Sequence, residues 1–422
     1  MHKMCPTNDM GRIANYTKTI SQYFTASLIP MVLNLAINPL VAIYMEPEDF
    51  AITGYFLSFT TLVSPIIAFY MIHYYNKRYF ELDDAGRSHM YALVFKMLIF
   101  FSAIVTGVCT LAIYLYIKQQ SEISFATYPY LYMVMLVVPL TGIYNLQLAK
   151  YKMERKSKQF MNISVMKGVL GVVLTLLFVV IIPWGAFGKL LGPLLLEIAC
   201  FAYILVKNKD VWKVKNTFSE VKPILLFCWP LVLGASLGYF SNGYDKAVLA
   251  TLGNNTEFGY YCVGASIAGY LTLFTSSLSA TFQPDIYEAI IKDNRPKLFK
   301  VAALQWVMIL GVVILFIAFC PLIIKILTAG RYIQSTGYAR LLACVCLANS
   351  IYYIINDYTI ARGLPRFYLY TTIIGSGLII LCIPIFVDWL GYYGGALANI
   401  ASFVALSIIN LILLLIHKTF QH

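Results

Sequence analysis

The chain has 422 residues, of which 60% are hydrophobic and only 12% are charged, and its mean hydropathy is +0.75. Soluble globular domains carry roughly 25% charged residues, so this composition excludes a soluble fold and indicates a polytopic membrane protein. A formal net charge of +12 would suit a nucleic-acid binder. However, the basic residues lie between apolar runs, and this placement favours a role in membrane topology over nucleic-acid binding.

Apolar runs long enough to cross a bilayer recur about twelve times along the chain. These runs are about twice as long as the strands of a membrane barrel, so helices are the predicted spanning element. The predicted spans are approximately 19–44, 50–74, 91–117, 129–149, 161–183, 187–206, 224–252, 257–284, 299–319, 338–360, 368–387 and 392–416. The sequence therefore predicts an all-α membrane protein.

Basic residues occur in every second connection between these spans. The basic connections contain residues 77–87, 150–158, 207–222 and 292–300, together with Arg362 and Arg366. The other connections, such as Met45–Phe50 and Gly253–Glu257, are short and nearly free of bases. Because loops rich in Lys and Arg stay on the cytoplasmic side, this alternation predicts that both termini are cytoplasmic.

A glycine pattern repeats in the two halves of the chain. Trp184–Gly192 reappears about 206 residues later as Leu390–Ala398. In both copies we expect the glycines to turn a short outer hairpin and to let the following helix pack closely. The repeat predicts two six-helix bundles related by a pseudo-two-fold axis along the membrane normal. The predicted boundaries are an N-terminal bundle at 1–206, a basic linker at 207–223 and a C-terminal bundle at 224–422.

An adjacent acid and base interrupt the seventh apolar run, within the stretch Ser241–Tyr261. An ionisable residue at the centre of a spanning helix costs roughly 2.5 to 3.5 kcal/mol, so such residues usually face protein or a watery cavity. Neighbours on a helix point about 100° apart, so Asp245 and Lys246 are not expected to form a side-by-side pair. Lys246 shares a polar sector with Asn242, which indicates either a substrate contact or a structural pair. Asp245 lies on the flank of that sector and is expected to be a strut, with ion coupling as its other candidate role.

Four stretches together resemble the bacterial polysaccharide flippases of the O-antigen translocase type. The N-terminal pattern Ile29–Leu40 followed by Glu46–Phe50 is similar to the opening of those proteins. Tyr244–Gly253 with Phe258–Tyr261, Pro321–Tyr332 and Gly391–Ala401 are similar to the seventh helix and its exit, the region entering helix ten, and the last hairpin. The resemblance covers nearly the whole chain.

This resemblance implies the fold of the multidrug, oligosaccharidyl-lipid and polysaccharide exporter superfamily, in which two six-helix bundles form a V that opens alternately to each side. It implies a substrate made of undecaprenyl diphosphate carrying a few sugars, moved from the inner to the outer leaflet of a bacterial inner membrane. The implied partners are that lipid-linked oligosaccharide, the bilayer, and a polysaccharide polymerase with a chain-length regulator.

Buried cations and acids are the candidate contacts for such a substrate, because a diphosphate cannot enter hydrocarbon unaccompanied. Lys96 and Lys167 either line the cleft or snorkel to the cytoplasmic surface. Arg340 either lines the cleft or anchors the outer interface. Glu197 is a candidate for coupling to an ion, and the alternative is pairing with a lysine of its own half.

Amide side chains mark two further helices. Asn34 and Asn38 share one face of the first helix, and Asn349 and Asn356 share a face of the tenth. Such residues suit sugar hydroxyls or a bend that opens the cleft, and interhelical hydrogen bonding is the competing interpretation.

An enzyme is not predicted. The five histidines lie near predicted cytoplasmic ends or the termini, so none is available for acid–base work or metal binding at membrane depth; they are His2, His73, His89, His417 and His422. The nine cysteines lack metal-ligand spacing, and neither a metal nor a cofactor is expected. Without a Gly-rich phosphate loop of the ATPase kind, transport is expected to use an ion gradient or the substrate gradient.

Two other functions stay open. A drug or metabolite exporter of the same fold is the first alternative. A membrane polysaccharide polymerase or ligase is the second, and it fits less well because those enzymes carry one large external loop, whereas the predicted external loops here are short.

Overall fold

The computed structural model describes residues 7–120, 122–123, 125–361 and 365–419, and it is almost entirely helical. Within that described part, twelve helices are long and apolar enough to cross a membrane, which confirms the predicted number. His2, Arg362 and His422 lie outside the described residues, as do the side chains of Arg366 and His417.

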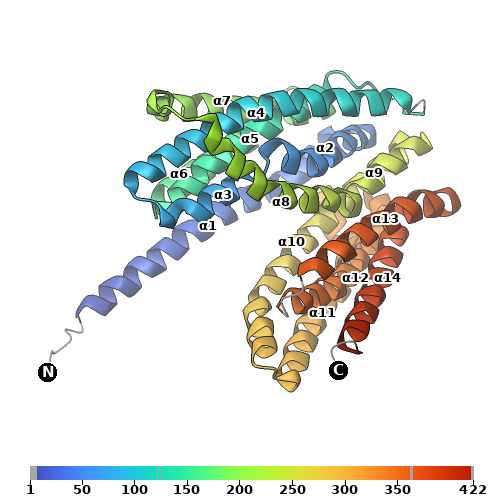
Figure 1. Cartoon of the computed structure of the whole chain (residues 1–422). Coiled ribbons are helices and arrows are strands. Elements are labelled where there is room, and N and C mark those ends of the chain that lie inside the picture. Colours follow the sequence, from blue (N-terminus) through green and yellow to red (C-terminus); the bar gives the residue numbers. More distant parts are fainter. Residues whose placement is uncertain (1–6, 121, 124, 362–364, 420–422) are drawn as a thin grey trace. The chain divides into compact units, whose positions relative to one another are not determined.

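The helices follow one another with short connections (Figure 1). The spanning helices are α1 (Thr7–Tyr44), α2 (Pro47–Ala68), α4 (Asp84–Gln119), α5 (Tyr130–Met153), α6 (Ser157–Thr175), α7 (Gly185–Lys207), α8 (Val221–Asn242), α10 (Asn255–Ile291), α11 (Arg295–Leu327), α12 (Thr336–Ala361), α13 (Pro365–Leu390) and α14 (Tyr392–Thr419). The short elements are α3 (Met71–Arg78), α9 (Tyr244–Leu249), the π-helical η2 (Leu176–Ile181), and the 3-10 turns η1 (Tyr79–Glu81), η3 (Lys209–Lys213), η4 (Phe218–Glu220), η5 (Ala250–Leu252) and η6 (Ile333–Ser335).

The chain divides into two compact units. Unit 1 comprises Met1–Tyr44, Val63–Tyr114 and Thr127–Val232, and unit 2 comprises Met45–Leu62, Leu115–Ala126 and Leu233–His422. Three helices, α2, α4 and α8, therefore begin in one unit and end in the other. The division of the sequence at 1–206, 207–223 and 224–422 stays a prediction.

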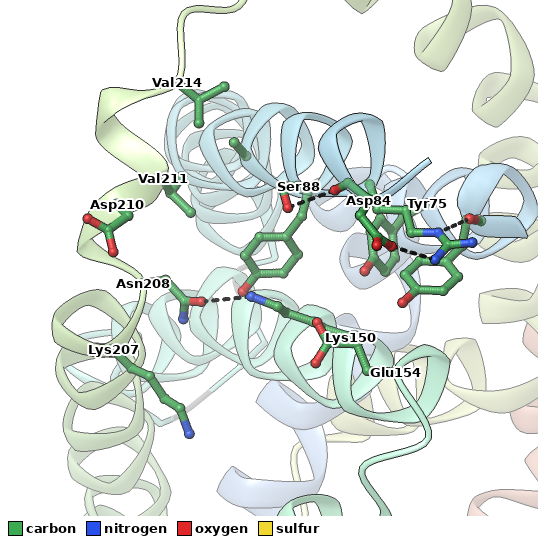
Figure 2. A pocket seen from close by; sticks show the side chains of 14 residues that line it. Tyr75, Asp84, Ser88, Lys150, Glu154, Lys207, Asn208, Asp210, Val211 and Val214 are labelled. Atoms are coloured by element: carbon green, nitrogen blue, oxygen red, sulfur yellow. Dashed lines mark hydrogen bonds and ion pairs between the residues drawn. The ribbon is translucent and has the colours of Figure 1, made fainter. Parts of the chain in front are cut away.

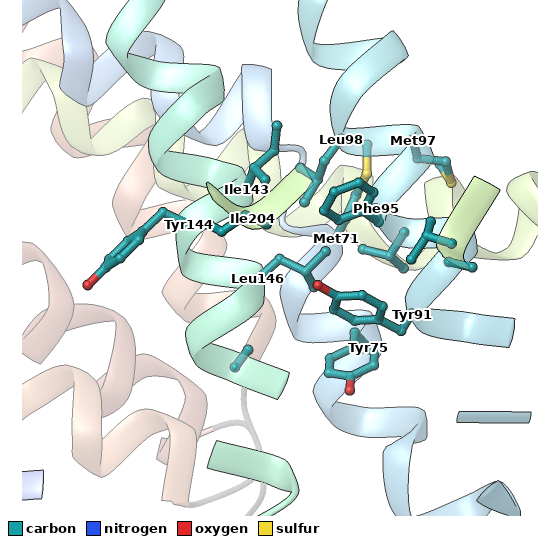
Figure 3. Close-up of a cluster of buried hydrophobic side chains, with 14 of the residues drawn as sticks. Met71, Tyr75, Tyr91, Phe95, Met97, Leu98, Ile143, Tyr144, Leu146 and Ile204 are labelled. Atoms are coloured by element: carbon teal, nitrogen blue, oxygen red, sulfur yellow. The ribbon is translucent and has the colours of Figure 1, made fainter. Parts of the chain in front are cut away.

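The core of unit 1 lies where α3, α4, α5 and α7 meet (Figure 3). Large side chains such as Met71, Phe95, Leu98, Leu146 and Ile204 are almost completely buried there. Leu98 and Ala68 also lie against Gly142 of α5. Because lipid removes the hydrophobic driving force between spanning helices, close packing of this kind holds them together.

Unit 2 has two smaller clusters of buried side chains. Leu271, Ile309, Val313 and Ala343 join α10, α11 and α12. A second cluster joins α12 to α14 and consists of Ala348, Tyr352, Phe403 and Leu406. The helix α12 thus lies at the centre of unit 2, between partners on both sides.

The predicted seventh helix is wrong in one respect, because it is not continuous. It is interrupted at Gly243, where α8 ends and α9 begins with φ −150° and ψ −25°. A side chain at this position would come within 2.9 Å of the Ser58 carbonyl oxygen and 3.0 Å of Thr61 Oγ1 on α2. The helix is interrupted where α2 packs too closely for any residue larger than glycine.

The predicted second helix is also shorter than expected. It ends at Ala68, and Phe69 and Tyr70 adopt left-handed backbone angles with φ 47° and 51° before α3 begins. Non-glycine residues seldom occupy that region, so the local packing must hold them there. The Phe69 ring packs edge-on against Phe101, with 5.2 Å between the ring centroids.

The repeated glycine pattern has the predicted roles in both copies. Gly185 and Gly391, the first glycines of the two copies, have φ of 54° and 58° and so adopt the left-handed turn that only glycine enters without strain. Three residues later, Gly188 and Gly394 each pack against a carbonyl group of the preceding helix. A Cβ atom at either position would overlap that carbonyl oxygen, which belongs to Phe178 in one copy and Phe386 in the other.

We therefore predict that Gly188→Ala lowers the folded yield of the protein. The added methyl group must push apart two helices, and such overpacking costs typically about 1–3 kcal/mol. The matched control is Gly107→Ala in α4, where nothing lies within 4 Å of the added carbon. Yield and monodispersity by fluorescence-detected size-exclusion chromatography test this, and equal yields of the two variants would contradict it.

Candidate functional site

An ion pair lies between α6 and α7 in unit 1. Lys167 Nζ and Glu197 Oε1 are 2.5 Å apart, and the two side chains are 19% and 6% exposed. Thr141 of α5 donates a hydrogen bond of 2.8 Å to the same carboxylate oxygen. The ammonium also lies 3.6 Å from the centre of the Tyr144 ring, a cation–π contact. Three helices thus contribute to one buried charged group.

The Glu197 carboxylate is only partly satisfied. Its second oxygen, Oε2, is buried and has no hydrogen-bond partner in the described part of the chain. A buried carboxylate with an open oxygen can accept a proton or a cation, and such a group inside a membrane is usually functional. Of the two roles predicted for Glu197, the structure contains the pairing with a lysine of its own half.

Lys96 makes its contacts with the linker that follows α7. Its ammonium donates a hydrogen bond of 2.5 Å to the Val214 carbonyl and another of 3.1 Å to Asn216 Oδ1. His89, about two turns earlier on α4, lies 3.1 Å from the Lys215 carbonyl. The basic end of α4 therefore holds the linker against the rest of unit 1.

In unit 2, Asp245 and Lys246 do form a pair, and the prediction that they would not is wrong. Lys246 Nζ lies 3.6 Å from Asp245 Oδ1. The Cα–Cβ bonds diverge as expected, but the four-carbon lysine side chain is long enough to bend back. The other carboxylate oxygen, Oδ2, accepts a short hydrogen bond from the buried Tyr261 hydroxyl of α10.

Further contacts fix α9 and the start of α10. Gly395 of α14 packs against Asp245 and Leu249, because a Cβ atom there would lie 3.5 Å from the Asp245 Cβ. A second hydrogen bond between a tyrosine and an acid lies nearby, in which the Tyr338 hydroxyl donates to Glu257. Asp245 is thus buried among three helices, as a strut would be, whereas Lys246 keeps 19% of its side chain exposed.

Two of the predicted amide residues make the same local bond. Asn34 Nδ2 donates to the Pro30 carbonyl at 2.8 Å, and Asn242 Nδ2 donates to the Gly238 carbonyl at 2.9 Å. Both side chains are exposed, Asn34 within α1 and Asn242 at the last residue of α8. Asn38 is half-buried, one turn after Asn34. The exposed amides keep donors and acceptors that a polar ligand could use.

The other two amides lie on α12. Asn356 is buried, and its Oδ1 accepts a hydrogen bond of 2.8 Å from Asn410 of α14. Asn349 has a buried Oδ1 without a partner in the described residues. The bond between Asn356 and Asn410 corresponds to the interpretation of these amides as interhelical hydrogen-bonding groups.

Two further polar residues of unit 2 are Arg340 and Asp357, an acid that sequence reasoning missed. The Arg340 Nε donates to the Ile317 carbonyl of α11 at 3.1 Å, and the side chain is exposed. Asp357, next to Asn356 in sequence, accepts a hydrogen bond of 2.9 Å from Gln283 of α10. The sequence does contain a signal for Asp357, which is a charged residue within an otherwise apolar predicted helix.

A second missed cluster lies at the start of α2. Arg331 Nη2 and Glu46 Oε1 form an ion pair of 3.1 Å, and the Tyr332 hydroxyl donates to the Met45 carbonyl at 2.6 Å. No group of three or more His, Cys, Asp or Glu side chains that could hold a metal occurs among the described residues.

Twelve apolar helices in the described part of the chain, with paired ionised residues among them, define a polytopic membrane protein. The sequence identifies its family: the model for polysaccharide biosynthesis proteins matches residues 40–337, and the chain belongs to this family. A search of curated proteins found no significant match to the chain.

The fold is shared with solved transporters of the MOP superfamily, to which the multidrug, oligosaccharidyl-lipid and polysaccharide exporters belong. A multidrug resistance MATE family transporter in its inward-facing conformation is similar with a TM-score of 0.64 and 15% identity, over 93% of this chain and 96% of that one. A MOP superfamily transporter from Pyrococcus furiosus gives 0.60 and 15%, over 94% of both chains. The outward-facing conformation of a MATE family transporter gives 0.58 and 16%, again over 94% of both. The predicted MATE-like fold class is confirmed.

The ion pair of unit 1 leads to a prediction about folding, measured as the yield of folded protein by size-exclusion chromatography. Lys167→Met leaves the buried Glu197 carboxylate without its cation, and breaking such a pair costs about 3–5 kcal/mol. We expect a strong loss of folded protein from this single variant. The double variant Lys167→Met with Glu197→Gln removes both charges and should recover most of the yield. Normal folding of the single variant would show that the pair contributes little.

Proposed function

We propose that this protein flips undecaprenyl-diphosphate-linked oligosaccharide from the cytoplasmic to the periplasmic leaflet for the assembly of a surface polysaccharide such as O-antigen or capsule. The observation that carries the proposal is the match of residues 40–337 to the polysaccharide biosynthesis family in a chain with a transporter fold. Alternating access is the proposed mechanism, because the charged head group of such a lipid cannot cross hydrocarbon without a polar path.

Lys246 is the proposed contact for the diphosphate. A phosphate group needs cations with free N–H donors, and a lysine ammonium has three. The Lys246 ammonium lies 3.6 Å from Asp245 Oδ1, which is longer than a hydrogen bond, and its side chain is partly exposed. Its donors can therefore turn to a ligand. The remaining proposed substrate contacts are Lys96, Lys167, Arg340, Asn34, Asn38, Asn242, Asn349 and Asn356.

Glu197 is the proposed group for coupling transport to an ion gradient, with Asp245 as a second candidate. Protonation of Glu197 would neutralise the partner of Lys167 and free the ammonium for an anionic ligand. The buried Oε2 is the atom that would receive the proton. Binding of a proton to Glu197 and binding of an anionic ligand to Lys167 would then be coupled, because the same lysine pairs with either the carboxylate or the ligand.

The proposed setting is a bacterial inner membrane with both termini in the cytoplasm. This orientation is supported by the basic residues between α5 and α6, between α7 and α8, and between α10 and α11. A polysaccharide polymerase and a chain-length regulator are the proposed protein partners. We propose no enzymatic step and no cofactor for this chain.

The decisive experiment is deletion of the gene in its host. We expect lipid-linked oligosaccharide to accumulate on the cytoplasmic leaflet and surface polysaccharide to disappear, because the assembly enzymes outside lose their substrate. Mass spectrometry of extracted lipids and staining of surface glycan measure both effects. Unchanged surface glycan together with increased sensitivity to cationic drugs would overturn the proposal and favour a drug exporter.

Lys246→Ala tests the proposed contact in the complemented deletion strain. A hydrogen bond to a charged group contributes about 1.5–3 kcal/mol, so export should fall about tenfold or more. Membrane abundance should stay normal, because Lys246 lies 3.6 Å from Asp245, beyond hydrogen-bond distance, and Asp245 keeps the hydrogen bond from Tyr261. The control is Lys292→Ala, which removes an exposed lysine paired with Glu288 and should leave export unchanged. Loss of abundance in Lys246→Ala would instead assign the lysine a structural role.

A further inference from the structure

A cavity of about 500 Å³ lies in unit 1, beside the linker (Figure 2). Its walls are the first turns of α4, the last turns of α5 and α7, the residues around η1, and the linker with η3. Three cationic side chains line it, Arg87, Lys150 and Lys207. None of the predicted substrate contacts or coupling residues belongs to its lining.

A buried network holds Lys150 in place. Gln147 Oε1 accepts hydrogen bonds from the Tyr91 hydroxyl at 2.8 Å and from Asn208 Nδ2 at 2.9 Å. The Lys150 ammonium lies 4.1 Å from the centre of the Tyr91 ring and 3.4 Å from Asn208 Oδ1 (Figure 2). A single long hydrogen bond leaves most of the three ammonium donors available. The Lys150 ammonium is therefore held in position while most of its N–H donors stay available to a ligand.

The acids of the cavity are already neutralised by other cations. Asp84 pairs with Arg87 at 2.9 Å, Glu154 with Lys156 at 2.7 Å, and Asp210 with Lys213 at 2.8 Å. In the last pair, the hydrogen bond from Lys213 holds the pKa of Asp210 below its usual range. The pairing partners Lys156 and Lys213 are not themselves among the lining residues.

Two lysines of the cavity form no close ion pair in the part of the chain that the structure describes. Within the described residues, neither Lys150 nor Lys207 has a carboxylate oxygen within 4.0 Å. The Lys207 ammonium instead donates to the Tyr203 hydroxyl at 3.3 Å and lies 5.0 Å from the Tyr151 ring. A hollow with two such ammonium groups, lined also by tyrosine hydroxyls, favours an anion with several acceptor oxygens.

We propose that this cavity binds a phosphate group, carried either by an anionic phospholipid or by a soluble phosphate compound. Lys150 and Lys207 contact the phosphate oxygens, and Arg87 borders the site. Both lysines lie in the last turn of a spanning helix, the depth at which lipid head groups are found. Because Asn208, Val211 and Val214 form one wall, the bound anion would also connect the linker to the ends of α4, α5 and α7.

Thermal unfolding of the full-length protein in neutral detergent tests the proposal. The probes are dioleoylphosphatidylglycerol, dioleoylphosphatidylcholine as the zwitterionic control, and inorganic phosphate. We expect phosphatidylglycerol to raise the unfolding midpoint by about 2 °C or more over phosphatidylcholine. A comparable rise with inorganic phosphate would support the site with a soluble ligand. If neither anion raises the midpoint above the zwitterionic control, the proposal is overturned.

The double variant Lys150→Gln with Lys207→Gln assigns the effect to this cavity. It should lose the rise in midpoint, whereas Lys292→Gln with Lys300→Gln, which removes two charges from the region where α10 ends and α11 begins, should keep it. An undiminished rise in the first variant would overturn the proposal. If the double variant does not fold, Lys207→Gln alone is used instead, because it changes only an exposed side chain. Native mass spectrometry should then show less retained phosphatidylglycerol than in the wild type, and equal retention would overturn the proposal.

Discussion

The high cost of an unpaired charge in hydrocarbon governs where this chain places its ionised side chains. Lys167 and Glu197 neutralise each other between α6 and α7, and Asp245 is held by Lys246 and Tyr261. Lys96 turns to the backbone of the linker. Each of these contacts also joins separate segments of the chain. The side chains proposed to bind the substrate and the coupling ion are therefore the same side chains that position the helices. Function and folding therefore share these residues.

The sequence was sufficient for the helices and their number, because a spanning helix needs only length and apolar composition. The glycine repeat was also predictable, since left-handed turns and close packing both require glycine. Partners were harder to predict. The contact between Lys246 and Asp245 depends on the bend of a flexible side chain, and the pairing of Glu197 with Lys167 depends on which helices are neighbours. Neither is encoded in spacing along one helix.

The interruption at Gly243 is a second feature that the sequence alone does not predict. Hydropathy favours one continuous helix there, and only the approach of the α2 backbone near Ser58 explains why the chain needs glycine and stops the helix. The interruption separates Asn242 at the end of α8 from Lys246 in α9. A polar sector calculated for an unbroken helix therefore does not describe how these two side chains are presented.

The three helices shared by the two units restrict how the protein can move. The chain passes from unit to unit inside α2 at Leu62–Val63, inside α8 at Val232–Leu233, and in α4 at Tyr114–Leu115, close to the end of that helix. A rearrangement of the units must thus be absorbed by bending within helices as well as by loops. Pro65 lies just beyond the passage in α2, and Pro230 lies just before the one in α8. Proline removes a backbone hydrogen bond and softens a helix at that place, so α2 and α8 each have a point of easier bending close to the passage between units.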